Sequence, residues 1–137
     1  ASEDAFFSLA YPHIASSPDG GASYYLPRLV GTKKAMEIAL LGDRFTARQA
    51  QGMGLINRVV ANGELQAETR TLAERLASGP TRAYGNIKKL ILESSDNSLE
   101  EQLQSEAETF GDSAMSEDWL EGVTAFNEKR PPKFTGR

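Results

Sequence analysis

The stretch of residues 16–31 constrains this chain more than any other, because it joins a sharp turn to the start of an apolar run. Pro18 and Asp19 come first, then the glycines Gly20 and Gly21. Glycine lets the backbone adopt left-handed conformations and leaves amides unshielded for a ligand. We therefore expect a tight turn that presents the Asp19 carboxylate, followed by a short helix.

Asp19 has two compatible interpretations. A carboxylate on a turn that faces a pocket can act as a general acid or base. An aspartate before a helix is also a good N-cap, here for a helix that begins at Gly20. Gly20 and Gly21 can support backbone contact with a ligand or only relieve crowding at the turn, and we favour the second. The residues alone leave both roles of Asp19 open.

The composition is typical of one globular domain with a modest core. The chain has 137 residues, of which 39% are apolar and 25% are charged,. The net charge is −4, with the lysines and arginines spread along the chain, which argues against nucleic-acid binding,. No apolar run approaches the roughly 20 residues of a membrane span. We expect neither nucleic acid nor a membrane as a partner.

The residue types that carry chemistry exclude further kinds of function. There is no cysteine, which excludes disulfides and thiolate chemistry and is compatible with a cytoplasmic enzyme,. No cluster of metal-ligating side chains has suitable spacing, so no metal is expected. The one histidine, His13, can serve in catalysis because it titrates near neutrality, or it can be an ordinary loop residue,.

Hydrophobic periodicity predicts few strands and many helices. Strands are expected at residues 5–10 and 55–60, and a loop at 11–17. Helices are expected to begin at residues 20, 33, 46, 64, 80, 98 and 116. Capping boxes are expected at Thr46 with Gln49 and at Ser98 with Glu101. In the helix after Ser98, one apolar stripe is expected, formed by Leu99, Leu103, Ala107 and Phe110. In the last helix, the residues expected to face inward are Trp119 or Leu120, Val123 and Phe126.

Several pieces of the chain, in order, carry a resemblance to a known family. They are residues 1–7, 18–31, 35–42, 50–60 and 121–134. In this order they resemble the crotonase superfamily, the enoyl-CoA hydratases and isomerases. The resemblance implies a helix-rich α/β chain with the crotonase-like (ClpP/crotonase) spiral fold. It further implies that residues 1–60 are the C-terminal part of the core and residues 61–137 a C-terminal helical region used in oligomerisation.

The same resemblance implies that the chain is the C-terminal half of a subunit. The upstream half would hold much of the spiral sheet, both oxyanion-hole amides, one of the catalytic carboxylates and most of the CoA-binding loop. A companion N-terminal half is therefore an expected partner, and the chain by itself is expected to be inactive. Crotonases form trimers, often paired into hexamers, so we expect a homotrimer or hexamer.

The family also implies a chemistry. It is hydratase or isomerase chemistry on an acyl-CoA thioester, through an enolate-like anion held by two backbone amides. Coenzyme A would be part of the substrate, with no further cofactor. Asp19 matches a position where dienoyl-CoA isomerases and phenylacetate-pathway isomerases carry a proton-moving aspartate. In chlorobenzoyl-CoA dehalogenases the matching aspartate is a nucleophile. A dehalogenase-like reaction and a non-catalytic CoA-binding or assembly module remain alternatives.

Tyr11 departs from the hydratase pattern. Enoyl-CoA hydratases resemble this chain but carry a glutamate at the position that matches Tyr11, which favours isomerase-type chemistry over plain hydration. A phenol with a pKa near 10 is a poor base at neutral pH. Tyr11 can donate a hydrogen bond to a substrate or simply line the pocket.

Phe126 and Lys129 lie three residues apart on the last predicted helix. The resemblance implies that such a pair contacts the adenine side and a phosphate of CoA, for which lysine suits as a point charge. The residues alone allow a second interpretation. Phe126 is then a core residue and Lys129 a favourable charge at the end of a helix.

Overall fold

The computed structural model describes residues 1–137. It divides into two compact units, Ala1–Thr69 and Arg70–Arg137. The first unit contains β1 (Phe6–Phe7), the 3-10 helix η1 (Tyr11–Ile14), α1 (Ala22–Val30), α2 (Thr32–Leu41), β2 (Phe45–Thr46) and α3 (Ala47–Gly52). The second contains α5 (Thr81–Glu93), α6 (Leu99–Ala114) and α7 (Glu117–Glu128). The boundary falls within α4 (Leu65–Ala77), whose residues are all exposed. None of these helices is long and apolar enough to cross a membrane.

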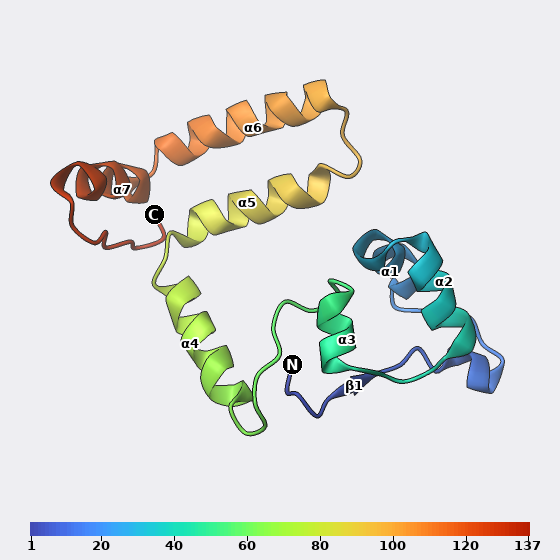
Figure 1. Ribbon diagram of the computed structural model, residues 1–137. Helices are drawn as coiled ribbons and strands as arrows, with labels where there is room; N and C mark the ends of the chain where they lie inside the picture. The colour runs from blue at the N-terminus through green and yellow to red at the C-terminus, as the bar shows by residue number, and fades with distance from the viewer. The chain divides into compact units, whose positions relative to one another are not determined.

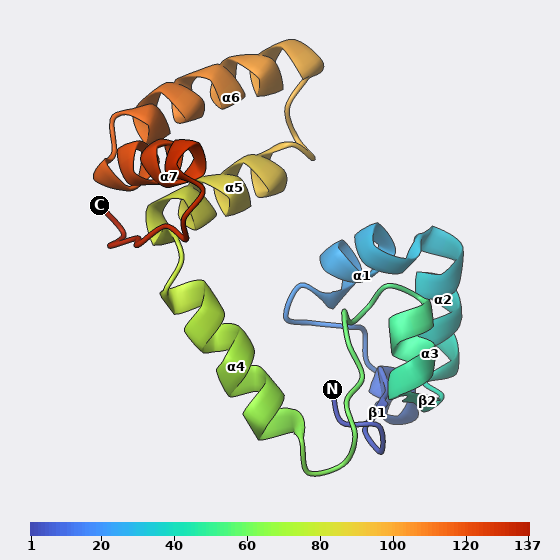
Figure 2. The same cartoon turned by 60° about the vertical axis from the view of Figure 1, so that its left-hand side comes forward.

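In the first unit, two short strands hold the helices together. β1 and β2 pair in antiparallel fashion, with Phe6 opposite Thr46 and Phe7 opposite Phe45. The rings of Phe7 and Phe45 stack with their centroids 5.7 Å apart. α3 follows β2 directly, and the Ala47 amide donates to the Ala5 carbonyl at 3.0 Å. Figure 2 shows α3 beside these strands and α1 packed against α2.

The core of the first unit lies between α1 and α2. Leu26 from α1 packs with Ala35 and Ile38 from α2, and each is only 7% exposed. Partly buried apolar residues surround them, namely Leu9, Val30, Phe45, Met53 and Leu55. The left-handed Gly42, at φ +66°, ends α2 as the sequence predicts,.

Three helices begin at side-chain caps, and two of these caps are the predicted capping boxes. Gln49 N donates to Thr46 Oγ1 at 3.2 Å while Thr46 N donates to Gln49 Oε1 at 2.8 Å, which completes a capping box. Ser98 forms the second box in the same way at the start of α6. At the start of α7, Trp119 N donates to Ser116 Oγ at 3.1 Å. These side chains satisfy helix amides that have no partner within the helix.

The predicted strands are largely wrong. Residues 55–60 form no strand, and Val60 makes only an isolated parallel bridge with Ser2. The segment 5–10 is reduced to β1. The segment 11–17, predicted as loop, contains η1, which Pro12 favours at its first turn,. Apolar and β-branched residues form a strand only where a neighbouring strand can hydrogen-bond to them. Here the pairing between backbone segments stops after a few residues.

In the second unit, α5 and α6 run side by side as an antiparallel pair (Figure 1). Polar side chains join them. Arg82 pairs with Asp112 at 2.6 Å, Asn86 Nδ2 donates to Ser113 Oγ at 2.9 Å, and Gln102 Nε2 donates to the Leu90 carbonyl at 3.2 Å. Polar groups between helices need hydrogen-bond partners, so α6 turns its polar face toward α5.

The predicted apolar stripe of α6 is exposed within this unit. Leu99, Leu103 and Phe110 are 69%, 55% and 67% exposed. In α7 the predicted inward face is wrong, because Trp119, Leu120, Val123 and Phe126 are 41%, 63%, 39% and 84% exposed. The buried residues of α7 are Asp118 and Ala125 instead. The apolar faces of both helices have no cover within their own unit.

Candidate functional site

The Asp19 turn is set by its two glycines. Gly20 and Gly21 have φ of +58° and +84°, a region that L-residues rarely adopt,. The Ala22 amide donates to the Asp19 carbonyl at 3.0 Å, and α1 begins at Ala22 rather than at Gly20. The ring of Tyr25 lies against Gly21, 3.2 Å from where a Cβ would stand. These contacts support the steric interpretation of the two glycines.

Asp19 does not cap the helix. Gly21 is the N-cap residue of α1, and no side chain accepts a hydrogen bond from the helix amides there. The reason is the length of the turn, since two left-handed residues separate the Asp19 side chain from the first helical residue. The predicted capping role is therefore wrong.

The Asp19 carboxylate is instead held by Tyr11. Tyr11 Oη donates to Asp19 Oδ1 at 2.6 Å. η1 presents the phenol, and the Ser16 amide closes the segment by donating to the Tyr11 carbonyl at 3.1 Å. The hydrogen bond to Asp19 raises the pKa of Tyr11 above its ordinary value, so this hydroxyl stays a donor at neutral pH,. The structure thus joins two of the predicted site residues.

An apolar pocket begins beside this turn. It has a volume of about 250 Å³, and Pro18 and Ala22, which flank the turn, belong to its lining. Leu9, Leu26 and Met36 line its other sides. The Asp19 carboxylate is exposed and lies outside the lining. The first unit therefore places an oriented carboxylate next to apolar surface.

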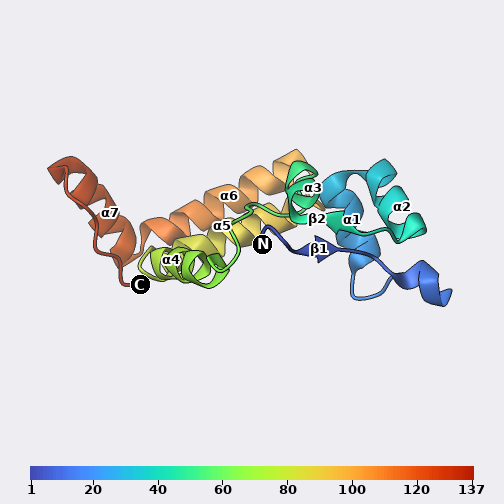
Figure 3. The same ribbon diagram turned by 60° about the horizontal axis from the view of Figure 1, so that its bottom comes forward.

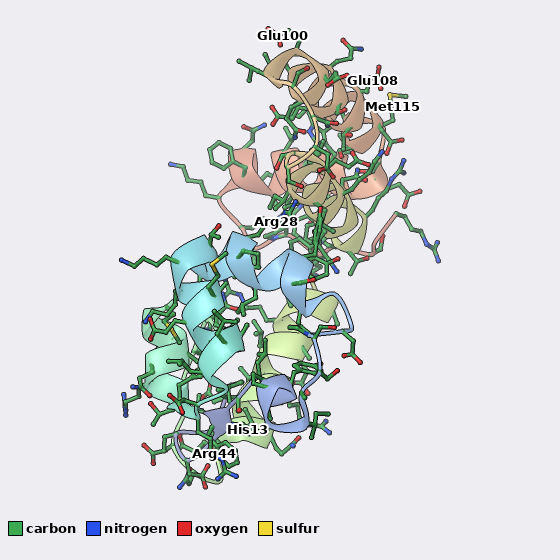
Figure 4. The ribbon with its side chains drawn as sticks, turned by 90° about the vertical axis from the view of Figure 1, so that its right-hand side faces the viewer. His13, Arg28, Arg44, Glu100, Glu108 and Met115 are labelled. Carbon is green, nitrogen blue, oxygen red and sulfur yellow. The ribbon has the colours of Figure 1, made fainter.

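His13 lies elsewhere. Its Nε2 is 3.1 Å from the point where a Cβ on Gly42 would stand, so the imidazole packs on the end of α2. Figure 4 shows His13 at the same end of the unit as Arg44, with Arg28 at the opposite end. Tyr11, not His13, supplies the hydrogen bond to Asp19.

Phe126 and Lys129 lie at the end of α7. Phe126 is 84% exposed, which overturns its interpretation as a core residue. Lys129 ends the helix in the left-handed conformation, at φ +55° and ψ +40°. The chain then turns back, and Figure 3 shows the C-terminal segment running beside α7. Both side chains of the predicted CoA-contacting pair are exposed.

Two carboxylates of α7 that the sequence analysis missed hold this C-terminal segment. The buried Asp118 accepts from the amides of Thr135 and Gly136 at 2.7 and 2.8 Å. Glu121 accepts from both Nη atoms of Arg130, at 2.7 and 2.9 Å. The available signal was two acidic residues three apart on one helix face, followed by an arginine nine residues after the second.

The Glu121 ion pair is electrostatically strong. The Arg130 guanidinium and the Lys133 amide hold the pKa of Glu121 down at about 2. Glu121 and Glu128 in turn raise the pKa of Arg130 above its ordinary value. A forked guanidinium on a carboxylate fixes direction as well as distance, so this pair orients the chain after α7.

Comparison with known proteins assigns the chain to a family. The family model for enoyl-CoA hydratase/isomerase matches residues 1–137, and the chain belongs to that family. The chain is 41% identical to a probable enoyl-CoA hydratase of Rhodobacter capsulatus and 39% identical to the 1,2-epoxyphenylacetyl-CoA isomerase of Escherichia coli. These matches cover 100% of the chain and 53% and 52% of the relatives.

Solved structures agree with the crotonase-like fold. A putative enoyl-CoA hydratase from Streptomyces coelicolor matches with a TM-score of 0.95 at 37% identity, over 100% of this chain and 50% of that one. A putative enoyl-CoA hydratase/isomerase from Mycobacterium abscessus matches with a TM-score of 0.97 at 35% identity, over 100% and 53%. The chain thus spans about half the length of the relatives it matches,.

Proposed function

We propose that this chain supplies a proton-transferring carboxylate, Asp19, to an enzyme that acts on acyl-CoA thioesters, with isomerase-type chemistry favoured over hydration. One observation carries the proposal. Tyr11 Oη donates to Asp19 Oδ1 at 2.6 Å on a glycine turn where the carboxylate caps no helix. The family membership supplies the substrate class.

The proposed step is a proton transfer. Asp19 takes a proton from a carbon next to the conjugated system of the acyl group, and the electron pair moves toward the thioester oxygen. The resulting enolate-like anion is held by backbone amides. Asp19, now protonated, returns the proton to a different carbon, which moves the double bond. Tyr11 keeps its own proton throughout and fixes Oδ1, which leaves Oδ2 for the substrate.

The residue at position 11 supports isomerisation. Moving a proton between two carbons needs one carboxylate that acts first as base and then as acid. The glutamate that enoyl-CoA hydratases carry at the position matching Tyr11 is absent, and here the neighbour of Asp19 is a phenol. Among the relatives, an isomerase of 1,2-epoxyphenylacetyl-CoA is 39% identical, and a trans-2-decenoyl-[acyl-carrier-protein] isomerase of Streptococcus mutans is 32% identical.

We also propose that the active enzyme is larger than this chain. The chain corresponds to the C-terminal half of a subunit, and a companion segment supplies the oxyanion-hole amides. The relatives are about twice as long, which supports a larger active enzyme,. The exposed apolar faces of α6 and α7 favour burial in an assembly, for which a cytoplasmic homotrimer or hexamer is the proposed form,. Intact mass and sedimentation of the purified protein test these points.

Phe126 and Lys129 are the proposed contacts for CoA. Both side chains are exposed at one end of α7. A lysine attracts a phosphate as a point charge, and an exposed ring offers a face to a purine. Gly20 and Gly21 are proposed to let the turn approach the acyl group closely.

The test compares the chain alone with the chain completed by its companion segment. We expect no turnover of crotonyl-CoA or of a 3-enoyl-CoA by the chain alone. In the completed enzyme, Asp19→Asn should lower kcat about 10²- to 10⁴-fold. Asp96→Asn, in the exposed turn after α5, is the matched control and should leave kcat unchanged.

Three outcomes would contradict the proposal. Robust turnover by the 137-residue chain alone contradicts the need for a companion. Full activity of the Asp19→Asn variant contradicts the role of the carboxylate. A covalent acyl or aryl adduct on Asp19, seen by mass spectrometry, would replace proton transfer by dehalogenase-like nucleophilic attack.

A further inference from the structure

We propose that Glu121 is a positioning residue for the nucleotide end of the acyl-CoA, acting through Arg130 on the left-handed turn at Lys129. This inference rests on the proposed function, because it takes Lys129 as the contact for a CoA phosphate. It goes further by naming the residues that hold Lys129 in place.

The turn at Lys129 is in a costly conformation. Its φ of +55° lies in a region where a side chain crowds the following carbonyl oxygen,. Within helix α7 only backbone bonds support it, with Lys129 N donating to the Phe126 carbonyl at 3.2 Å and Arg130 N to the Ala125 carbonyl at 3.0 Å. A lysine keeps such a conformation when its surroundings fix it, and residues of this kind concentrate at ligand sites.

Glu121 fixes the residue that follows. Its two carboxylate oxygens accept from the two Nη atoms of Arg130, and Oε1 also accepts from the Lys133 amide at 2.7 Å. Arg130 Nε donates to Glu128 Oε2 at 2.6 Å. Glu121 thus ties positions 130 and 133 to the second turn of α7. With both ends of the turn held, the backbone of Lys129 has little freedom to relax.

The charges of this cluster leave Lys129 available for an anion. Glu121 and Glu128 neutralise Arg130, its immediate neighbour. Lys129 is exposed and forms no ion pair within the chain. The exposed ring of Phe126 lies one helical turn earlier,. An ammonium and an aromatic face presented together suit a nucleoside phosphate, which is the far end of coenzyme A.

The test is binding of adenosine 3′,5′-bisphosphate to the chain completed by its companion segment, measured by calorimetry. Lys129→Ala removes the proposed contact and should weaken binding. Glu121→Gln should weaken binding about three- to tenfold, the size of coupling between neighbouring side chains. Glu121→Asp keeps the charge and should restore part of the loss. Glu117→Gln, on the exposed first turn of the same helix, is the matched control and should bind like the wild type.

Two further measurements separate positioning from general damage to the fold. The double variant Glu121→Gln with Lys129→Ala should bind no more weakly than Lys129→Ala, because Glu121 acts through Lys129. The coupling between the amide and α protons of residue 129, measured by NMR, reports its φ. It should show loss of the positive φ in Glu121→Gln and not in the control Glu117→Gln. Circular dichroism checks that α7 persists.

The binding measurements test the positioning role of Glu121 separately from the proposed acyl-CoA reaction. Unchanged binding by Glu121→Gln, additive losses in the double variant, or no binding by the wild type each overturn the positioning role. Binding that depends on Glu121, without acyl-CoA turnover by the completed enzyme, overturns the proposed reaction and leaves the positioning role supported.

Discussion

Tyr11 Oη donates to Asp19 Oδ1 at 2.6 Å, and this bond joins two residues on either side of a seven-residue connection that contains Ser16 and Pro18. A 3-10 helix fixes the phenol, and two left-handed glycines fix the carboxylate. The bond orients a carboxylate that is otherwise exposed to solvent. It therefore distinguishes an oriented acid from a helix cap.

The pKa of Tyr11 should depend on Asp19. The hydrogen bond to the Asp19 side chain is the largest cause of the raised pKa, so Asp19→Ala should return it toward the ordinary value of about 10,. NMR of tyrosine labelled at Cζ measures this. Because the folded pKa is raised, the contribution to stability is complete below about pH 10 and is lost as the pH rises through the folded pKa. An unchanged Tyr11 titration in Asp19→Ala would contradict the bond.

Asp19 should matter less for stability than the serine caps. Asp19→Ala removes no helix cap, only the solvent-exposed hydrogen bond from Tyr11, and should change the free energy of unfolding by no more than about 0.5 kcal/mol,. Ser98→Ala removes the acceptor for the Glu101 amide and should cost about 1 kcal/mol,. Urea denaturation of the two variants measures the difference. Equal losses in both would show that Asp19 supports the helix after all.

The two glycines of the turn should differ in their tolerance of alanine. Gly20→Ala meets no atom within 4 Å but must adopt φ +58°, at a cost of about 1–2 kcal/mol,. Gly21→Ala has the same backbone cost and also displaces the Tyr25 ring, 3.2 Å away. Gly85→Ala, inside α5 in open space, should instead stabilise by about 0.5–1 kcal/mol,. Thermal unfolding of the three variants ranks their stabilities. A stabilising effect of Gly21→Ala would contradict the positive φ and the close Tyr25 ring at this position.

The C-terminal segment should stay bound to α7 in mild acid. The pKa of Glu121 is lowered to about 2 from an ordinary value of 4.5. A lowered carboxyl pKa contributes stability above about pH 4.5 that is lost as the pH falls through the folded value,. The Lys133 amide donates to Glu121, so its NMR shift should titrate with a midpoint at about 2. A midpoint near 4.5 would mean that the ion pair does not persist in solution.

Local signals in the sequence predicted the helices well. Thr46 and Ser98 form capping boxes with residues three positions later, and Gly42 ends α2. Such signals act within one turn of the chain, so the sequence contains everything that they need. The strand predicted at 55–60 failed because pairing depends on a distant segment, and only Ser2 meets Val60.

The candidate site, like the fold, could be predicted from the sequence only in part. The two glycines predicted the turn at Asp19 from the sequence alone. That Phe126 and Lys129 are both exposed became clear only from the structure, in which α7 buries Asp118 and Ala125 instead. Helical periodicity showed that α6 and α7 have apolar stripes but not which face would be covered. Packing of the polar face of α6 against α5 decided that.

The sequence by itself determined the helix starts, the left-handed glycine turn and the family, because these depend on local backbone preferences and on residue order. Only the tertiary structure decided that Tyr11, rather than the amides of α1, engages Asp19. It also decided that Glu121 pairs with Arg130 after α7 ends. Both contacts depend on where the chain returns in space, which residue spacing alone does not fix.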